Sequence, residues 1–209
     1  EIDVISNDVT SIVCIGDSIT DGYGIDINAL NRYSDFLAEL IADDPDFDNI
    51  AVAAKRIGGG WMGAIDSRFN RDVLSVNGAG YCVLLAGINT IGYMSSDDAA
   101  SVINQYKTWI DKCHANDIKV IGVTVLPFKN SQYDDTASGG SNYSEYREPA
   151  RLEINDFILN SGYFDAAVDL ASMVADQNDF QIIDERYTND YLHLNSVGYE
   201  LMGKAVYDC

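Results

Sequence analysis

A serine, an asparagine and a histidine stand at places in this chain where they could act together on a carbonyl group. Ser18 follows an apolar run at 11–16, and Asn89 follows another at 81–87. His193 lies near the end of the chain, in "NDYLHLNSVGY". A serine hydroxyl becomes a strong nucleophile when a base removes its proton, and histidine is the usual base near neutral pH. An amide side chain can stabilise the oxyanion that follows. These residue types therefore predict acyl transfer.

The chain has two histidines, and each has an aspartate three residues before it. The pairs are Asp111 with His114 and Asp190 with His193, so spacing alone favours neither. His114 ends a predicted helix that leads into a strand, which places it at the edge of the sheet away from Ser18. We therefore interpret Asp111 and His114 as a surface pair. Asp190 can hold one ring nitrogen of His193 while the other nitrogen faces Ser18.

The elements that must position these residues alternate between apolar runs and amphipathic segments. The runs are apolar nearly throughout, which is typical of strands covered on both faces of a parallel sheet. They lie at 11–16, 49–54, 81–87, 119–126 and 164–170. The helical segments lie at 32–44, 98–117, 148–162 and 196–208. This order predicts a three-layer α/β/α sandwich with a central five-stranded parallel sheet, flavodoxin-like, in which ligands bind at the carboxyl ends of the strands.

Composition narrows the class of protein. The 209 residues suit a single domain spanning 1–209, and 13 basic against 33 acidic residues give a net charge of −20. That charge argues against nucleic acid and anionic membrane surfaces as partners. No apolar run reaches the ~20 residues of a membrane span. The chain starts at Glu1 with no signal peptide, so either none existed or it was removed before this numbering begins.

The cysteines stand at positions 14, 82, 113 and 209 and form no C-x-x-C pair. A zinc site or a thioredoxin-like motif is therefore not expected. Cys14 and Cys82 lie within apolar runs and are predicted to be buried thiols. Four cysteines allow three disulfide pairings, and the sequence selects none of them.

Each candidate residue also has an ordinary structural interpretation. Ser18 could be a helix N-cap, and Asn89 could be a turn residue that caps the next segment. The glycines of "GGGWMG" fit G-x-G-x-x-G at Gly58, Gly60 and Gly63. That pattern follows the second strand, and no acidic residue at a strand end supports a ribose contact. We interpret it as a flexible loop that borders the site.

Three ordered motifs resemble those of the SGNH (GDSL-type) hydrolases, particularly secreted carbohydrate esterases. "GDSITDGYG" resembles the first family block, "GINTIG" the third, and "DYLH" the last. The resemblance implies the SGNH hydrolase fold and a catalytic triad of Ser18, His193 and Asp190. It also implies an oxyanion hole formed by Ser18, Ala54 and Asn89. It further implies a secreted protein. No cofactor and no metal are expected.

Two positions depart from the family pattern. Ala54 stands where the second block has a glycine that donates its backbone N–H. If that position needs a positive φ, one of Gly58 to Gly60 becomes the donor instead. Thr90 replaces the usual aspartate after Asn89.

The expected activity is hydrolysis of carboxylic esters, most of all O-acetyl groups on carbohydrate. The residues expected to contact substrate or shape its site are Asp17, Gly87 and Trp61. Four aromatic residues could stack on a sugar, or could equally pack in the core or at the surface: Trp61, Tyr93, Tyr133 and Tyr143. The last two lie within a predicted surface loop at 128–146. Three alternatives stay open: a short-chain lipase or arylesterase, a non-catalytic carbohydrate-binding module, and a nucleotide-dependent enzyme.

Overall fold

The computed structural model describes residues 9–26 and 28–209. Its strands form one parallel sheet in the order β2-β1-β3-β4-β5. The strands are β1 Thr10–Gly16, β2 Ile50–Arg56, β3 Ala79–Leu85, β4 Lys119–Val123 and β5 Ala166–Val168. The predicted five-stranded parallel sheet is confirmed, with each strand overlapping the apolar run that indicated it.

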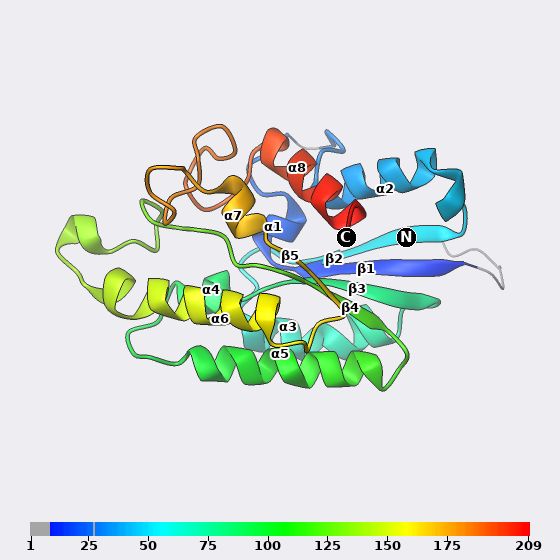
Figure 1. Ribbon diagram of the computed structural model, residues 1–209, viewed down its shortest axis with the longest axis horizontal. Coiled ribbons are helices and arrows are strands. Elements are labelled where there is room, and N and C mark those ends of the chain that lie inside the picture. The colour runs from blue at the N-terminus through cyan, green and yellow to red at the C-terminus, as the bar shows by residue number, and fades with distance from the viewer. Residues whose placement is uncertain (1–8, 27) are drawn as a thin grey trace.

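Helices cover both faces of this sheet (Figure 1). They are α1 Ser18–Asp21, α2 Tyr33–Asp43, α3 Met62–Phe69, α4 Ile88–Ile91, α5 Ala99–His114, α6 Glu148–Asn160, α7 Leu170–Val174 and α8 Ser196–Tyr207. On one face α2 packs against α8, and on the other lie α3, α5 and α6 (Figure 1). The predicted three-layer α/β/α class is therefore confirmed.

The strand order places a crevice beside β1. The chain passes from β1 to β2 on one side and then crosses to β3 on the other side. At such a reversal the connections after the two central strands diverge, which leaves room for a ligand outside their carboxyl ends. Ser18 follows β1 and Asn89 follows β3. The sheet topology alone thus brings these two residues to one crevice.

The glycine-rich segment after β2 divides between a turn and a helix. Gly58, Gly59 and Gly60 lie in the turn at 57–60, which borders the cleft as predicted, and Gly63 lies within α3. Met62, Ile65 and Phe69 recur at helical spacing and are buried, so burial of this face stabilises the helix. The helix continues into one π-helical turn at Asn70–Leu74.

The predicted surface loop at 128–146 is packed against the core. Phe128, Tyr133 and Tyr143 are at most 7% exposed. The ring of Phe128 lies edge-on to Tyr143 at 5.2 Å and to Tyr133 at 6.4 Å between centroids. The abundance of Gly, Ser and Asn in this segment indicated a surface loop, but these three buried aromatic side chains hold it in place.

Candidate active site

Ser18 is the first residue of α1, and only Asp17 separates it from the carboxyl end of β1 beside the crevice. Asp17 is the N-cap of this helix, and its Oδ1 accepts a hydrogen bond from the Ile19 N–H at 3.0 Å. The first backbone N–H groups of a helix have no partner within it. The Ser18 N–H is therefore free of the helix ladder, while its side chain is only 9% exposed.

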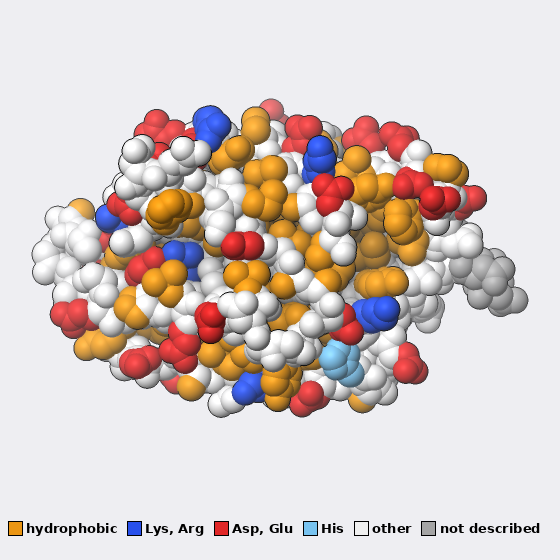
Figure 2. Space-filling model, in the orientation of Figure 1, with side chains coloured by type: hydrophobic (Ala, Val, Ile, Leu, Met, Phe, Trp, Pro, Cys, Tyr) orange, Lys and Arg blue, Asp and Glu red, His pale blue; other side chains and the backbone are white. Residues whose placement is uncertain are grey.

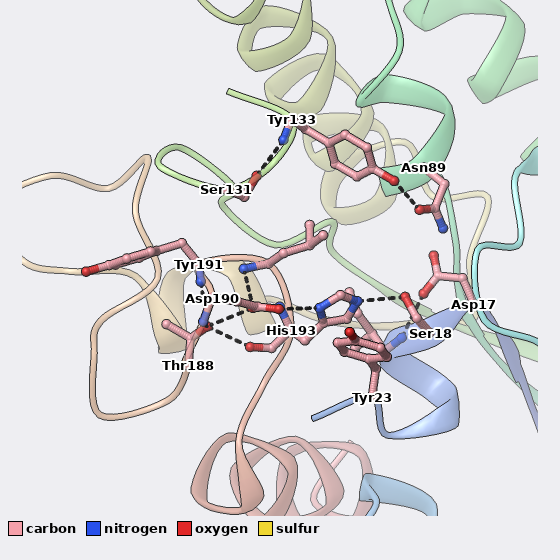
Figure 3. Close-up of polar contacts among 12 residues, drawn as sticks. Asp17, Ser18, Tyr23, Asn89, Ser131, Tyr133, Thr188, Asp190, Tyr191 and His193 are labelled. Carbon is pink, nitrogen blue, oxygen red and sulfur yellow. Dashed lines mark hydrogen bonds and ion pairs between the residues drawn. The ribbon is translucent and has the colours of Figure 1, made fainter. Parts of the chain in front are cut away.

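Ser18, His193 and Asp190 form one hydrogen-bonded series (Figure 3). Ser18 Oγ lies 2.9 Å from His193 Nε2, and His193 Nδ1 lies 2.7 Å from Asp190 Oδ2. A carboxylate on Nδ1 fixes the tautomer that leaves Nε2 as the acceptor of the serine proton. The structure thus brings together three residues from opposite ends of the chain in the geometry of a nucleophile, a base and an orienting carboxylate.

The loop before α8 is built to hold the histidine. Asp190 Oδ1 accepts the backbone N–H groups of Leu192 at 3.0 Å and His193 at 2.8 Å. Thr188 Oγ1 donates to the His193 carbonyl at 2.7 Å. Tyr191 takes a left-handed conformation with a φ of 59°, which turns the chain between Asp190 and His193.

The same contacts favour the ionised form of Asp190. Partial burial raises the pKa of this carboxyl, but the hydrogen bonds from the His193 ring and from two backbone N–H groups outweigh it and lower the pKa overall. A carboxylate that stays ionised can stabilise an imidazolium when His193 takes up a proton.

Asn89 lies in α4 across the cleft from His193. Its Oδ1 accepts from the Tyr133 hydroxyl at 2.7 Å, and its Nδ2 donates to the Gly60 carbonyl at 3.2 Å (Figure 3 for the first contact). Thr90, the departure from the family pattern, accepts the Met62 N–H on its Oγ1 at 3.1 Å and so ties α4 to α3. The amide nitrogen of Asn89 is thereby placed at the cleft.

Ala54 and the glycines at 58–60 are the candidates for a second backbone donor, and they lie at different distances from the cleft. Ala54 lies within β2, paired with Cys14 of β1, two residues before the strand ends. Gly58 and Gly59 line the cleft instead. Gly59 has a φ of 71°, which a side chain would strain, and the Gly60 N–H already donates to the Ile57 carbonyl at 3.2 Å. Of the alternatives at Gly58 to Gly60, the first two therefore remain.

A cleft of about 480 Å³ opens above Ser18, a size suited to a small ligand. It is lined by Ser18, Tyr23, Gly58, Gly59, Asn89, Tyr93, Gln132, Tyr133, Asp190, Leu192 and His193. Two of the expected aromatic residues, Tyr93 and Tyr133, are among them. Tyr143 is buried, and Trp61 is exposed with its ring over Gly63.

The residues expected to bind substrate lie outside this lining. Asp17 is fully buried beneath the nucleophile. Gly87 precedes α4 and faces the side chains of Val125 and Tyr106. Both shape the crevice through the backbone, because each stands where a strand end turns into a short helix.

Arg68 of α3 connects two strand ends and was not singled out from the sequence. Its guanidinium donates to the Gly16 carbonyl at 2.7 Å and to the Lys55 carbonyl at 3.1 Å, and it pairs with Asp72 at 2.9 Å. The side chain is 6% exposed. The signal in the sequence was an arginine between Ile65 and Phe69 on the apolar face of a helix.

The second histidine lies at the opposite edge of the sheet, as its position in the chain predicts. His114 Nε2 lies 2.9 Å from Asp165 Oδ2, and its side chain is 43% exposed. Its partner is Asp165, which precedes β5, and not Asp111. Asp111 is one helical turn away on α5, whereas Asp165 also accepts the Val120 N–H at 2.7 Å.

The family model of GDSL-like lipases and acylhydrolases matches residues 14–201, a span that includes Ser18, Asn89, Asp190 and His193. The chain belongs to this family. No curated protein matches it in sequence.

Solved structures share the fold of this GDSL-like protein at low sequence identity. A GDSL-like lipase from Bacteroides thetaiotaomicron VPI-5482 is 18% identical with a TM-score of 0.74, covering 95% of this chain and 86% of that chain. A lipase/acylhydrolase from Enterococcus faecalis is 22% identical with a TM-score of 0.70, covering 96% and 94%. An acetyl xylan esterase is 20% identical with a TM-score of 0.71, covering 95% and 98%.

The described part of this GDSL-like protein, residues 9–26 and 28–209, shows no cluster of side chains able to hold a metal ion. Within the same residues, no helix is long and apolar enough to cross a membrane. The four cysteines are unpaired; Cys14, Cys82 and Cys113 are buried and Cys209 is exposed.

The burial of Asp17 should make the stability of the fold depend on pH. Its Oδ2 is buried without a hydrogen-bond partner among the described residues, and burial raises the pKa to about 7 although the Ile19 N–H and Arg68 lower it. Between pH 4 and 7 the folded protein therefore binds a proton that the unfolded chain releases, so this group's stabilising contribution falls as pH rises. Above pH 7 the contribution is lost.

Replacing Asp17 by asparagine removes this titration and keeps an oxygen for the Ile19 N–H. Relative to the wild type, the free energy of unfolding of the variant should rise by about 2 to 3 kcal/mol from pH 5 to pH 8, at about 1.4 kcal/mol per pKa unit over roughly two units. Urea unfolding at both pH values measures the difference. Parallel pH dependence in the two proteins would contradict the shift.

Proposed function

We propose that this GDSL-like protein is a serine ester hydrolase that acts on short-chain carboxylic esters, above all O-acetyl groups on carbohydrate. The observation that carries the proposal is the hydrogen-bonded series from Ser18 Oγ through His193 to Asp190. In this account the Ser18 N–H, the Asn89 amide and an N–H of Gly58 or Gly59 bind the oxyanion.

The reaction follows from these positions. Ser18 Oγ attacks the ester carbonyl while His193 Nε2 takes the hydroxyl proton, and the oxyanion forms opposite the three donors. The intermediate collapses, the bond from the acyl carbon to the alcohol oxygen breaks, and His193 returns the proton to the alcohol. Water then attacks the acyl-serine by the same steps in reverse order, which releases the acid and restores Ser18.

The lining of the cleft favours a short acyl group. Leu192 is the one aliphatic side chain among the lining residues that the structure describes, and it is 4% exposed. A long acyl chain would meet tyrosine rings and polar groups there in place of the aliphatic side chains that usually hold such chains, whereas an acetyl group needs no apolar surface beyond the immediate site. This favours acetyl esters over long-chain lipids.

The rim of the cleft favours a sugar as the alcohol. Tyr23 and Tyr93 are 61% and 77% exposed and offer aromatic faces that also carry hydroxyl groups. Figure 2 shows carboxylates spread over the face that it draws, consistent with a net charge of −20, which favours a neutral substrate over an anionic one. One protein of the same fold is an acetyl xylan esterase. Secretion, as expected from the resemblance, fits a polymeric substrate.

A substrate panel tests this proposal. Acetylated xylan and acetylated monosaccharides should release acetate faster than nitrophenyl esters release long acyl chains. The Ser18→Ala variant, run on the same panel, measures the background hydrolysis that is subtracted from each rate. Faster turnover of long-chain esters would favour the lipase alternative, and binding of acetylated xylan with no acetate release would favour the carbohydrate-binding module.

A further inference from the structure

We propose that Tyr133 is a positioning residue that sets the orientation of the Asn89 amide in the oxyanion hole. The proposal rests on the proposed function, because it concerns how that site is organised. Tyr133 Oη donates to Asn89 Oδ1 at 2.7 Å, and each of the two residues is 7% exposed (Figure 3). The structure thus joins the segment at 128–146 to the catalytic residues through one buried hydrogen bond.

The direction of this hydrogen bond decides which end of the amide faces the substrate. A neutral phenol donates one proton, and of the two ends of the amide only the oxygen accepts it. Asn89 Nδ2 must then lie on the other side, where one hydrogen reaches the Gly60 carbonyl at 3.2 Å and the other is left for the oxyanion. Burial raises the pKa of Tyr133 to about 12, so its hydroxyl remains a donor over the working range of pH.

Loss of the hydroxyl would remove the shorter of the two hydrogen bonds that fix this orientation and leave the longer one, to the Gly60 carbonyl, to oppose the turned form. The oxygen and nitrogen ends of an amide have nearly the same shape, so a half-turn meets no steric barrier from packing alone. In the turned form the amide oxygen would face the developing negative charge. The site would lose a donor and gain a repulsion, both of them in the transition state and not in the bound substrate.

Several contacts hold Tyr133 in place. Arg147 donates to the Tyr133 carbonyl at 2.6 Å and to the Met94 carbonyl at 3.1 Å. The Tyr133 N–H donates to Ser131 Oγ at 3.1 Å. Gly92, just after α4, lets the ring approach the backbone, because a Cβ atom there would lie 2.5 Å from the ring.

A double-mutant cycle tests the proposal, with Tyr133→Phe, Asn89→Ala and the combined variant compared with the wild type. Tyr133→Phe should lower kcat for an acetyl ester by about 10-fold or more with little change in KM. Asn89→Ala should lower kcat by about 10²- to 10³-fold. If Tyr133 acts through Asn89, adding Tyr133→Phe to Asn89→Ala should cause no further loss.

Tyr143→Phe is the matched control. Tyr143 is a buried tyrosine of the same segment, and its hydroxyl contacts Glu148 at 3.3 Å and the Gln181 carbonyl at 3.4 Å, away from the cleft. This variant should keep the wild-type kcat. Thermal unfolding of every variant separates lost activity from lost structure.

The outcomes distinguish the two proposals. If Ser18→Ala and Asn89→Ala keep full activity, the proposed function fails and the role of Tyr133 fails with it. If both are impaired while Tyr133→Phe keeps the wild-type kcat, only the role of Tyr133 is overturned. Losses that multiply in the combined variant would likewise show that Tyr133 acts independently of Asn89.

Discussion

Replacing Ser18 by alanine should lower the rate of ester hydrolysis by about 10⁴-fold or more. The change removes the one oxygen that lies 2.9 Å from His193 Nε2 and leaves the base without a nucleophile to activate. The side chain is small and lies at the floor of the cleft, so its loss should leave the fold intact. The initial rate of 4-nitrophenyl acetate hydrolysis measures the effect.

Ser34→Ala is the control for this change. Ser34 is a serine of α2 that is 3% exposed, and it lies outside the cleft lining. Its variant should keep the wild-type rate. Equal activity in Ser18→Ala and wild type, with both proteins folded, would exclude Ser18 as the nucleophile.

His193→Ala should cause a loss of similar size, because a serine hydroxyl without its base is a weak nucleophile. Asp190→Asn should cause a smaller loss, because it changes the partner of His193 Nδ1 but leaves the base in place. The two rate constants for acetyl ester hydrolysis, compared with that of wild type, give the order of effects. Retained activity in His193→Ala would contradict the assignment of the base.

The chain offers a matched control in its other histidine. His114 also lies 2.9 Å from an aspartate, but at the opposite edge of the sheet. His114→Ala should therefore leave the rate unchanged. A loss in His114→Ala equal to that in His193→Ala would show that the assay reports general damage and not the loss of a base.

Much of the fold could be predicted because the buried strands leave a strong pattern. The runs that became β1, β3 and β4 are apolar nearly throughout, and a parallel sheet is the usual place for such strands. The strand-end rule then brought Ser18 and Asn89 to one edge and separated His193 from His114. Those positions depend on the topology of the sheet. The alternation of strands and helices along the sequence predicts that topology.

The backbone donor proposed for the turn at 57–60 could not be predicted in the same way. The sequence offered Ala54 or one of three glycines, and a shift of a few residues at a strand end decides between them. The turn at 57–60 is fixed by contacts from elsewhere in the chain, including the Asn89 amide on the Gly60 carbonyl. Such contacts leave no periodic signal.

Tyr133 and Arg68 show a second kind of contact that the sequence pattern does not predict. From the sequence, Tyr133 could stack on a sugar or pack in the core or at the surface, and its hydroxyl bond to Asn89 joins residues 44 positions apart. The contacts of Arg68 with the two strand ends join residues 52 and 13 positions apart. Side-chain hydrogen bonds of this kind follow from the packed structure and not from local pattern.

The most direct test of Ser18 as the nucleophile is the mass of the protein after treatment with a serine-directed fluorophosphonate. The wild type should gain one adduct, and the mapped peptide should carry it on Ser18. Ser18→Ala should gain none, and Ser34→Ala should react like the wild type. An adduct on another residue, or equal labelling of Ser18→Ala and wild type, would contradict the account.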